Sequence, residues 1–235
     1  MKLKPVILTD IDGVAIRWQS GLPFFLSKHN MPTDVALEMA SDEKFRSLTD
    51  IFGCNDQLAK ILMEEYNNSS FIRYLNAYDD ALQVINRLKV KYDFVAVTAL
   101  GTTPSASLNR IANLNTLFPS AFKEVCVVNH NESKTHRYLD AKAKYGDRLV
   151  CFIDDLAVNL DDCHNVISQL PLFHMIRGER DKPSAPHTVV RSWFDIEHAL
   201  TRHAVIQNNP ILDFIENSLT EQEKKQEGLD DLIHS

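Results

Sequence analysis

The sequence of 235 residues lacks the features that mark membrane proteins, secreted proteins and nucleic-acid-binding proteins. No run of apolar residues approaches the roughly 18–20 that cross a bilayer, so we expect no membrane partner. The N-terminal residues form no apolar signal region with a cleavage site, and we expect a cytoplasmic protein. The formal net charge of −7 argues against an extended nucleic-acid surface, which requires clustered Lys and Arg.

Cysteine is also scarce. The four cysteines are far apart and form no CxxC pair, so we expect neither a zinc site nor a disulfide framework. Cys126 and Cys151 lie in apolar runs typical of strands, where a small buried thiol is the simplest role. The 44% of hydrophobic and 24% of charged residues are typical of an ordinary globular protein with one large domain, or a core with an insert.

The most informative segment is an apolar run that ends at two carboxylates. Residues 6–9 form a short buried strand, and Asp10 and Asp12 follow it, with Gly13 allowing a sharp turn. In an open α/β sheet, ligands bind beyond the carboxyl ends of the strands. The pair therefore predicts a metal or phosphoryl site, the alternative being that Asp12 and Gly13 only open a turn.

Strands and helices alternate along most of the chain. This order predicts βαβ units, and we expect an α/β fold with a Rossmann-like parallel sheet, helices on both of its faces and a small α-helical cap. The expected strands cover 6–9, 92–98, 124–128, 149–153 and 172–176, and the expected helices cover 104–115, 133–145 and 193–200, with another beginning at Asp79.

The segment after the first strand is too long for a βα loop. Residues 15–26 could form a small hairpin, whereas 32–75 have a helical pattern in which Asn55 is a plausible N-cap. We expect a core domain of residues 1–18 and 76–207 and a helical cap of residues 19–75.

The C-terminal segment 208–235 differs in composition from the rest of the chain. It is highly charged, and Thr220 with Glu223 matches a capping box. We expect a charged helix or tail, and an amphipathic docking element is the other reading.

Polar side chains suited to one phosphate follow the other expected strands. Thr98 closes the second strand, and Asp154 and Asp155 close the fourth. Lys134 begins the helix after the third strand, although Lys123, Lys142 and Lys144 also lie between the second and fourth strands. The ordered set is much less probable by chance than any member alone.

This set resembles the four motifs of the haloacid dehalogenase-like (HAD) superfamily of phosphohydrolases. The motifs correspond to residues 10–14, Thr98, Lys134 and the pair Asp154 and Asp155, and the resemblance covers residues 5–200 without the insert. It implies that Asp10 is the nucleophile, forming an aspartyl-phosphate.

The resemblance also assigns the remaining roles. Asp12 would protonate the leaving oxygen and then activate water. Thr98 and the backbone N–H of Ala99 would hold phosphate oxygens, and Lys134 would offset negative charge.

It further implies a Mg²⁺ cofactor. Its ligands would be the Asp10 carboxylate, the Asp12 carbonyl, Asp155 and, directly or through water, Asp154.

The insert is expected to select the substrate. Trp18 and four phenylalanines of the insert (Phe24, Phe25, Phe45 and Phe52) could stack on a nucleobase or sugar, or could instead pack the core of the cap. Arg17 could bind a second anionic group, as could Lys44, Arg46 and Arg73, although each could equally be solvated. We count Trp18 and Arg17 among the predicted substrate-binding residues.

Together these features predict a Mg²⁺-dependent phosphatase of small phosphorylated metabolites, with a 5′-nucleotidase as the leading candidate. A sugar-phosphate phosphatase or phosphomutase is the alternative within the same chemistry. A binding or scaffold protein on the same fold is the alternative of a different class. Clustered carboxylates are electrostatically costly without a cation, which counts against the scaffold.

Overall fold

The computed structural model describes residues 3–44, 46–101, 103–130 and 132–207. The predictions for Phe45 and for the segment 208–235 lie outside the described residues. The chain forms two compact units, Met1–Trp193 and Phe194–Ser235. The first contains the whole sheet and the segment after the first strand, and the described part of the second continues helix α9. No described helix is both long enough and apolar enough to cross a membrane.

The first unit is built on a parallel sheet whose strand order is β3-β2-β1-β4-β5-β6. Strand β1 is central and completely buried, because both faces of a parallel sheet are covered by crossover helices. The strands are β1 (Val6–Thr9), β2 (Asp93–Leu100), β3 (Phe122–Asn129), β4 (Leu149–Asp154), β5 (Leu172–Met175) and β6 (Thr188–Val190). The predicted α/β class and parallel sheet are confirmed, whereas β6 was not predicted.

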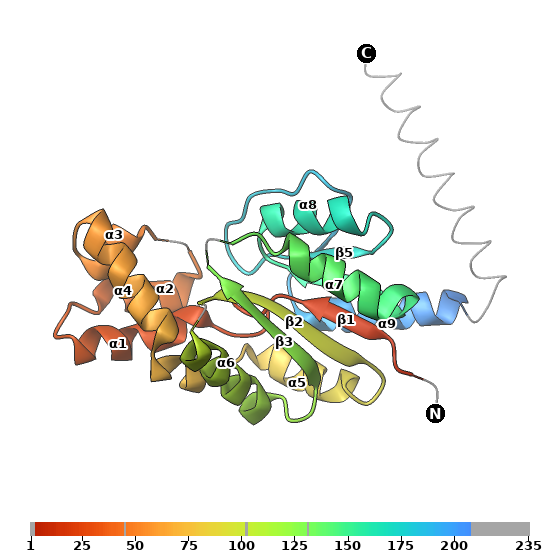
Figure 1. The fold of residues 1–235 in the computed structure, drawn as a ribbon, viewed down its shortest axis with the longest axis horizontal. Coiled ribbons are helices and arrows are strands. Elements are labelled where there is room, and N and C mark those ends of the chain that lie inside the picture. Colours follow the sequence, from red (N-terminus) through yellow and green to blue (C-terminus); the bar gives the residue numbers. More distant parts are fainter. Residues whose placement is uncertain (1–2, 45, 102, 131, 208–235) are drawn as a thin grey trace, which may run out of the picture. The chain divides into compact units, whose positions relative to one another are not determined.

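Helices cover both faces of the sheet. Figure 1 shows α5 and α6 on one face and α7 and α8 on the other. Buried side chains such as Leu8, Val97 and Phe152 form the core between the sheet and Tyr138 of α7. The helices are α5 (Asp79–Leu88), α6 (Pro104–Leu117), α7 (Thr135–Tyr145), α8 (Ala157–Val166) and α9 (Trp193–Gln207), with a 3-10 turn η3 (Gly146–Arg148).

The segment between β1 and α5 is helical throughout its described elements. It contains η1 (Trp18–Gly21), α1 (Leu22–Lys28), α2 (Asp34–Asp42), α3 (Leu48–Phe52), α4 (Asp56–Asn68) and η2 (Ser70–Tyr74). We call residues 18–75 the cap. Figure 1 shows α1–α4 gathered at the end of the sheet toward which the arrows of β2 and β3 point. The division into core and cap domains remains a prediction.

Two local predictions need correction. The hairpin at residues 15–26 is wrong, because Leu22, Phe25 and Leu26 are spaced as one buried helical face and α1 forms there instead. Strand β2 also does not end at Thr98, since its pairing with β3 continues to Leu100. The predicted N-cap of α4 is confirmed, with Asn55 Oδ1 accepting from the Leu58 N–H at 3.0 Å.

Candidate active site

Three buried carboxylates meet at the carboxyl edge of the sheet. Asp10 follows β1, and Asp154 and Asp155 end and follow β4, which pairs directly with β1. One carboxylate oxygen from each of these residues lies within 4.8 Å of the other two. Strand register therefore brings together acids that are far apart in the sequence.

Lys134 is a buried cation between two of these acids. It is the N-cap residue of α7, and its Nζ donates to Asp10 Oδ1 at 2.7 Å and to Asp154 Oδ2 at 3.0 Å. Burial alone would lower the pKa of Lys134, but Asp10 and Asp154 outweigh it and raise that pKa above its usual value. Lys142 and Lys144 instead contact the Val166 carbonyl and Glu124, away from this cluster.

Burial and mutual repulsion disfavour the ionised forms of Asp10 and Asp155 in this cluster. Burial raises the pKa of Asp10 well above its usual value despite Lys134, and the neighbouring carboxylates add to the shift. Burial and Asp154 raise the pKa of Asp155 to about 6, although Arg180 Nε donates to Asp155 Oδ2 at 2.8 Å. Asp155 also lies against Gly13, whose φ is +76° and where an added Cβ would collide with the Asp155 carboxylate.

Asp154 and Asp155 differ in their surroundings. Asp154 is completely buried, and its oxygens accept from the Leu156 N–H at 2.9 Å and from Asn159 Nδ2 at 3.0 and 3.1 Å. Asp155 lines the cavity described below together with Asp10, whereas Asp154 does not. Asp155 thus faces the cavity, whereas the oxygens of Asp154 are held by neighbouring donors.

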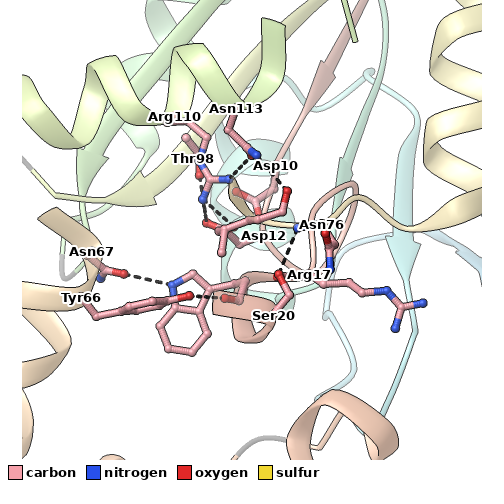
Figure 2. A network of polar contacts seen from close by, with 12 residues as sticks. Asp10, Asp12, Arg17, Ser20, Tyr66, Asn67, Asn76, Thr98, Arg110 and Asn113 are labelled. Carbon is pink, nitrogen blue, oxygen red and sulfur yellow. Dashed lines mark hydrogen bonds and ion pairs between the residues drawn. The ribbon is translucent and has the colours of Figure 1, made fainter. Parts of the chain in front are cut away.

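Asp12 is held by a different cation. Arg110 of α6 is completely buried, and its Nη2 lies 2.6 Å from both carboxylate oxygens of Asp12, as Figure 2 shows. Thr98 Oγ1 donates to Asp12 Oδ2 at 3.4 Å. Arg110 was not among the residues predicted from the sequence. Its signal was a polar cluster, with Asn109 and Asn113, on the buried face of α6.

Asp10, Asp12 and Asp155 open onto one cavity of about 560 Å³ between the sheet edge and the cap. This volume is within the usual range for small-molecule sites, roughly 300–1,000 Å³. Ala99 and Lys134 also line it, whereas the buried Thr98 reaches the site through Asp12. The apolar wall on the cap side is formed by Trp18, Met39, Leu48, Ile51 and Met63.

Trp18 is held in place on this wall. Its Nε1 donates to Asn67 Oδ1 at 3.0 Å, and its carbonyl accepts from the Tyr66 hydroxyl at 2.6 Å. The rings of Trp18 and Tyr66 pack edge to face, with centroids 5.1 Å apart. Asn67 also lines the cavity, although it was not predicted from the sequence.

The other predicted substrate residues are placed differently. Arg17 Nη1 pairs with Glu43 Oε1 at 3.1 Å, and Figure 2 shows its guanidinium pointing away from Asp10 and Asp12. Arg17 does not line the cavity, and its role in substrate binding remains a prediction. Of the remaining candidates, Lys44 and Arg46 line the cavity and Arg73 does not, Phe25 and Phe52 are buried in the cap, and Phe24 is exposed.

Solved structures share this architecture at low sequence identity. A haloacid dehalogenase-like family hydrolase from Streptococcus pneumoniae matches 83% of this chain and 98% of its own, with a TM-score of 0.57 and 10% identity. A HAD-hydrolase from Bacillus subtilis, solved bound to magnesium, matches 85% and 100% with a TM-score of 0.55 and 15% identity. The L-2-haloacid dehalogenase from Xanthobacter autotrophicus matches 85% and 99%, with a TM-score of 0.56 and 11% identity.

The sheet order, the acidic edge and these matches define a protein with the haloacid dehalogenase-like fold. No family model matches the sequence. The chain is 50% identical over 198 residues to the "uncharacterized 32.4 kDa protein in Gp30-rIII intergenic region" of Enterobacteria phage T4, covering 84% of this chain and 70% of that protein. The chain belongs to the same family as this phage protein.

Proposed function

We propose that the protein is a Mg²⁺-dependent phosphatase that hydrolyses a small phosphomonoester through an aspartyl-phosphate. The observation that carries the proposal is the position of Asp10: a buried carboxylate, clustered with two others and bonded to Lys134, that opens onto the cavity under the cap. A buried anion of this kind is typical of a functional site, because its electrostatic cost brings no structural benefit.

Asp12 favours phosphoryl chemistry over dehalogenation. The neighbours in fold include both hydrolases of the HAD family and haloacid dehalogenases. A halide leaves without a proton, whereas the alkoxide released from a phosphomonoester needs one. Asp12 lines the cavity beside Asp10 and supplies an acid for that purpose.

The proposed reaction has two steps. Oδ2 of Asp10, the oxygen that Lys134 does not contact, attacks phosphorus while the bond to the leaving oxygen breaks. Asp12, ion-paired with Arg110 in the free protein, would carry a proton in the substrate complex and give it to that oxygen. Asp12 then takes a proton from water, which attacks the phosphorus of the aspartyl-phosphate and releases inorganic phosphate and Asp10. Lys134 would neutralise charge on the phosphoryl oxygens and the Ala99 N–H would bind one of them, while the buried Thr98 would act through its hydrogen bond to Asp12.

The residues present fit a Mg²⁺ ion. Hard divalent cations prefer carboxylate oxygens, and the three buried acids of the cluster pair with Lys134 and Arg180. Asp10, Asp155 and the Asp12 carbonyl would hold the ion, with Asp154 as a direct or water-mediated partner. When bound, the ion would offset charge on the phosphoryl group.

Hydrolysis assays test this proposal. The full-length protein is assayed with p-nitrophenyl phosphate, nucleoside monophosphates and sugar phosphates, in Mg²⁺ and in chelator, with Asp10→Asn as the control. We expect release of inorganic phosphate that requires both Mg²⁺ and Asp10. Turnover by Asp10→Asn, or turnover in chelator, would refute the mechanism. Transfer of phosphate between sugar hydroxyls without its release would indicate the mutase, and absence of all turnover would favour a binding protein.

A further inference from the structure

The amide of Asn67 has a fixed orientation. The Trp18 indole N–H can only donate a hydrogen bond, so the atom facing it at 3.0 Å must be the Asn67 oxygen. The Nδ2 group of Asn67 is therefore not the atom that meets Trp18. Asn67 is 1% exposed and lines the cavity. Because its oxygen is engaged by Trp18, the group that it offers to a ligand is the Nδ2 hydrogen-bond donor.

The surroundings of this amide suit a flat, uncharged ring. Trp18 is half-buried, and its indole is fixed by both Asn67 and Tyr66. Met39 and Met63 line the same wall, and thioether side chains adapt well to aromatic surfaces. A rigid aromatic side chain beside apolar ones offers a contact surface at little entropic cost.

We propose that Trp18 and Asn67 form a specificity site that accepts nucleobases carrying a carbonyl group and discriminates against those carrying an amino group at the same position. This inference rests on the proposed phosphatase function. Asn67 Nδ2 donates to the carbonyl oxygen of uracil, thymine, hypoxanthine or guanine. The exocyclic amino group of cytosine or adenine would place a donor against this donor, which leaves two buried polar groups without partners.

Matched substrate pairs test the preference. UMP and CMP differ by a carbonyl or an amino group at one ring carbon, with the adjacent ring nitrogen changing from an N–H donor to an acceptor, and IMP and AMP differ in the same way. For the wild-type protein we expect kcat/KM to favour the keto member of at least one pair by about tenfold, the size of one exchanged hydrogen bond. A pyrimidine effect without a purine effect, or the reverse, tells which ring the cavity accepts. Ratios near or below one in both pairs would overturn the proposal.

Asn67→Asp gives a sharper test. One carboxylate oxygen would still accept from Trp18, and the other would accept from an amino group, so the keto preference should reverse. Gln57→Glu is the matched control, because it makes the same amide-to-acid change at an exposed position of the same helix, outside the cavity. An unchanged ratio in Asn67→Asp, or an equal change in both variants, would contradict the assigned role.

Trp18→Phe provides a second variant should Asn67→Asp not fold. Phenylalanine cannot donate a hydrogen bond, so the Asn67 amide becomes free to present either its oxygen or its nitrogen. The keto preference should then fall toward one, and its persistence would contradict the orienting role of Trp18. Thermal unfolding curves of each variant verify that the compared proteins are folded.

Binding measurements separate this inference from the proposed function. Calorimetric titration of the Asp10→Asn variant with each nucleotide in Mg²⁺ measures affinity without turnover. A keto preference in binding together with no hydrolysis by the wild type would uphold the specificity site and refute the phosphatase. Hydrolysis without any keto preference in binding or in kcat/KM would uphold the phosphatase and refute the specificity site.

Discussion

Asp10 and Asp12 lie two residues apart, yet we expect their replacement by asparagine to change the free energy of unfolding in opposite directions. The reason is the difference between their partners. Asp12 neutralises Arg110, which is completely buried, whereas Asp10 is an anion crowded by Asp154 and Asp155. Both variants should lose activity, so their stabilities carry the independent information.

The cost of Asp12→Asn follows from the buried guanidinium. Removal of one partner from a buried ion pair costs about 3–5 kcal/mol because the other charge remains buried. The Asp12 side chain is 19% exposed, which places the expected loss near the lower end, at about 3 kcal/mol. For a chain of this size that corresponds to a decrease in Tm of roughly 6–12 °C.

Asp10→Asn should have no such cost. The amide oxygen can still accept from Lys134, which also keeps Asp154 as a partner. The variant removes an anion whose pKa is raised by burial, and it relieves repulsion among the carboxylates. We expect a gain of about 1 kcal/mol in the absence of metal, as is common when a strained catalytic group is replaced.

Urea and thermal unfolding in chelator at pH 7, followed by circular dichroism, measure both effects. The double variant Asp12→Asn with Arg110→Met removes both charges and should recover part of the stability that Asp12→Asn loses. An Asp12→Asn variant as stable as the wild type, or an Asp10→Asn variant equally destabilised, would refute the electrostatic reasoning.

Three other perturbations test the site. Burial and Asp154 raise the pKa of Asp155 to about 6 in the folded protein, above its ordinary value of about 3.9, so its contribution to metal-free stability should fall as pH rises from about 4 to 6. Mg²⁺ binds the ionised carboxylate and should therefore raise Tm more at pH 7 than at pH 5. An equal rise in Tm at the two pH values would contradict this. Lys134→Ala should lower kcat/KM at least about 100-fold, whereas the exposed Lys144→Ala should change it less than about twofold; equal losses would contradict the assignment. Gly13→Ala should abolish the Mg²⁺-dependent rise in Tm. Gly53→Ala, also at positive φ but with no atom of the described residues within 4 Å of the added methyl group, should lose only about 1–2 kcal/mol and keep that rise.

The acidic cluster could be predicted because it depends on local pattern and simple topology. An apolar strand followed by acids occurs twice, at Asp10 and at Asp154, and parallel strands carry both to the same edge. Lys134 could be placed because a strand ends shortly before it and a helix begins directly after it. Each of these inferences needs only neighbouring residues and the common direction of the strands.

The partners of these residues could not be predicted in the same way. Arg110 meets Asp12 across 98 sequence positions, and Asn67 meets Trp18 across 49, through the packing of helices whose relative positions no periodicity encodes. The hairpin prediction at residues 15–26 failed for a related reason: a short apolar run around a turn suits a strand or a helix until its packing partners are known.

The polar face of α6 explains why Asp10 and Asp12, two residues apart, are held by different partners. Asp10 is positioned by strand β1 of the sheet and by its hydrogen bond from Lys134. Asp12 depends on Arg110, and the neighbouring side chains on that face hold the end of the cap: Asn109 Nδ2 donates to the Ser69 carbonyl at 3.0 Å, and Asn113 Nδ2 donates to the Leu75 carbonyl at 2.9 Å. A displacement of cap residues 69–75 therefore acts on the helix that positions Asp12. The proposed nucleophile is fixed by the core, and the proposed acid is connected to the cap, whose side chains line the cavity.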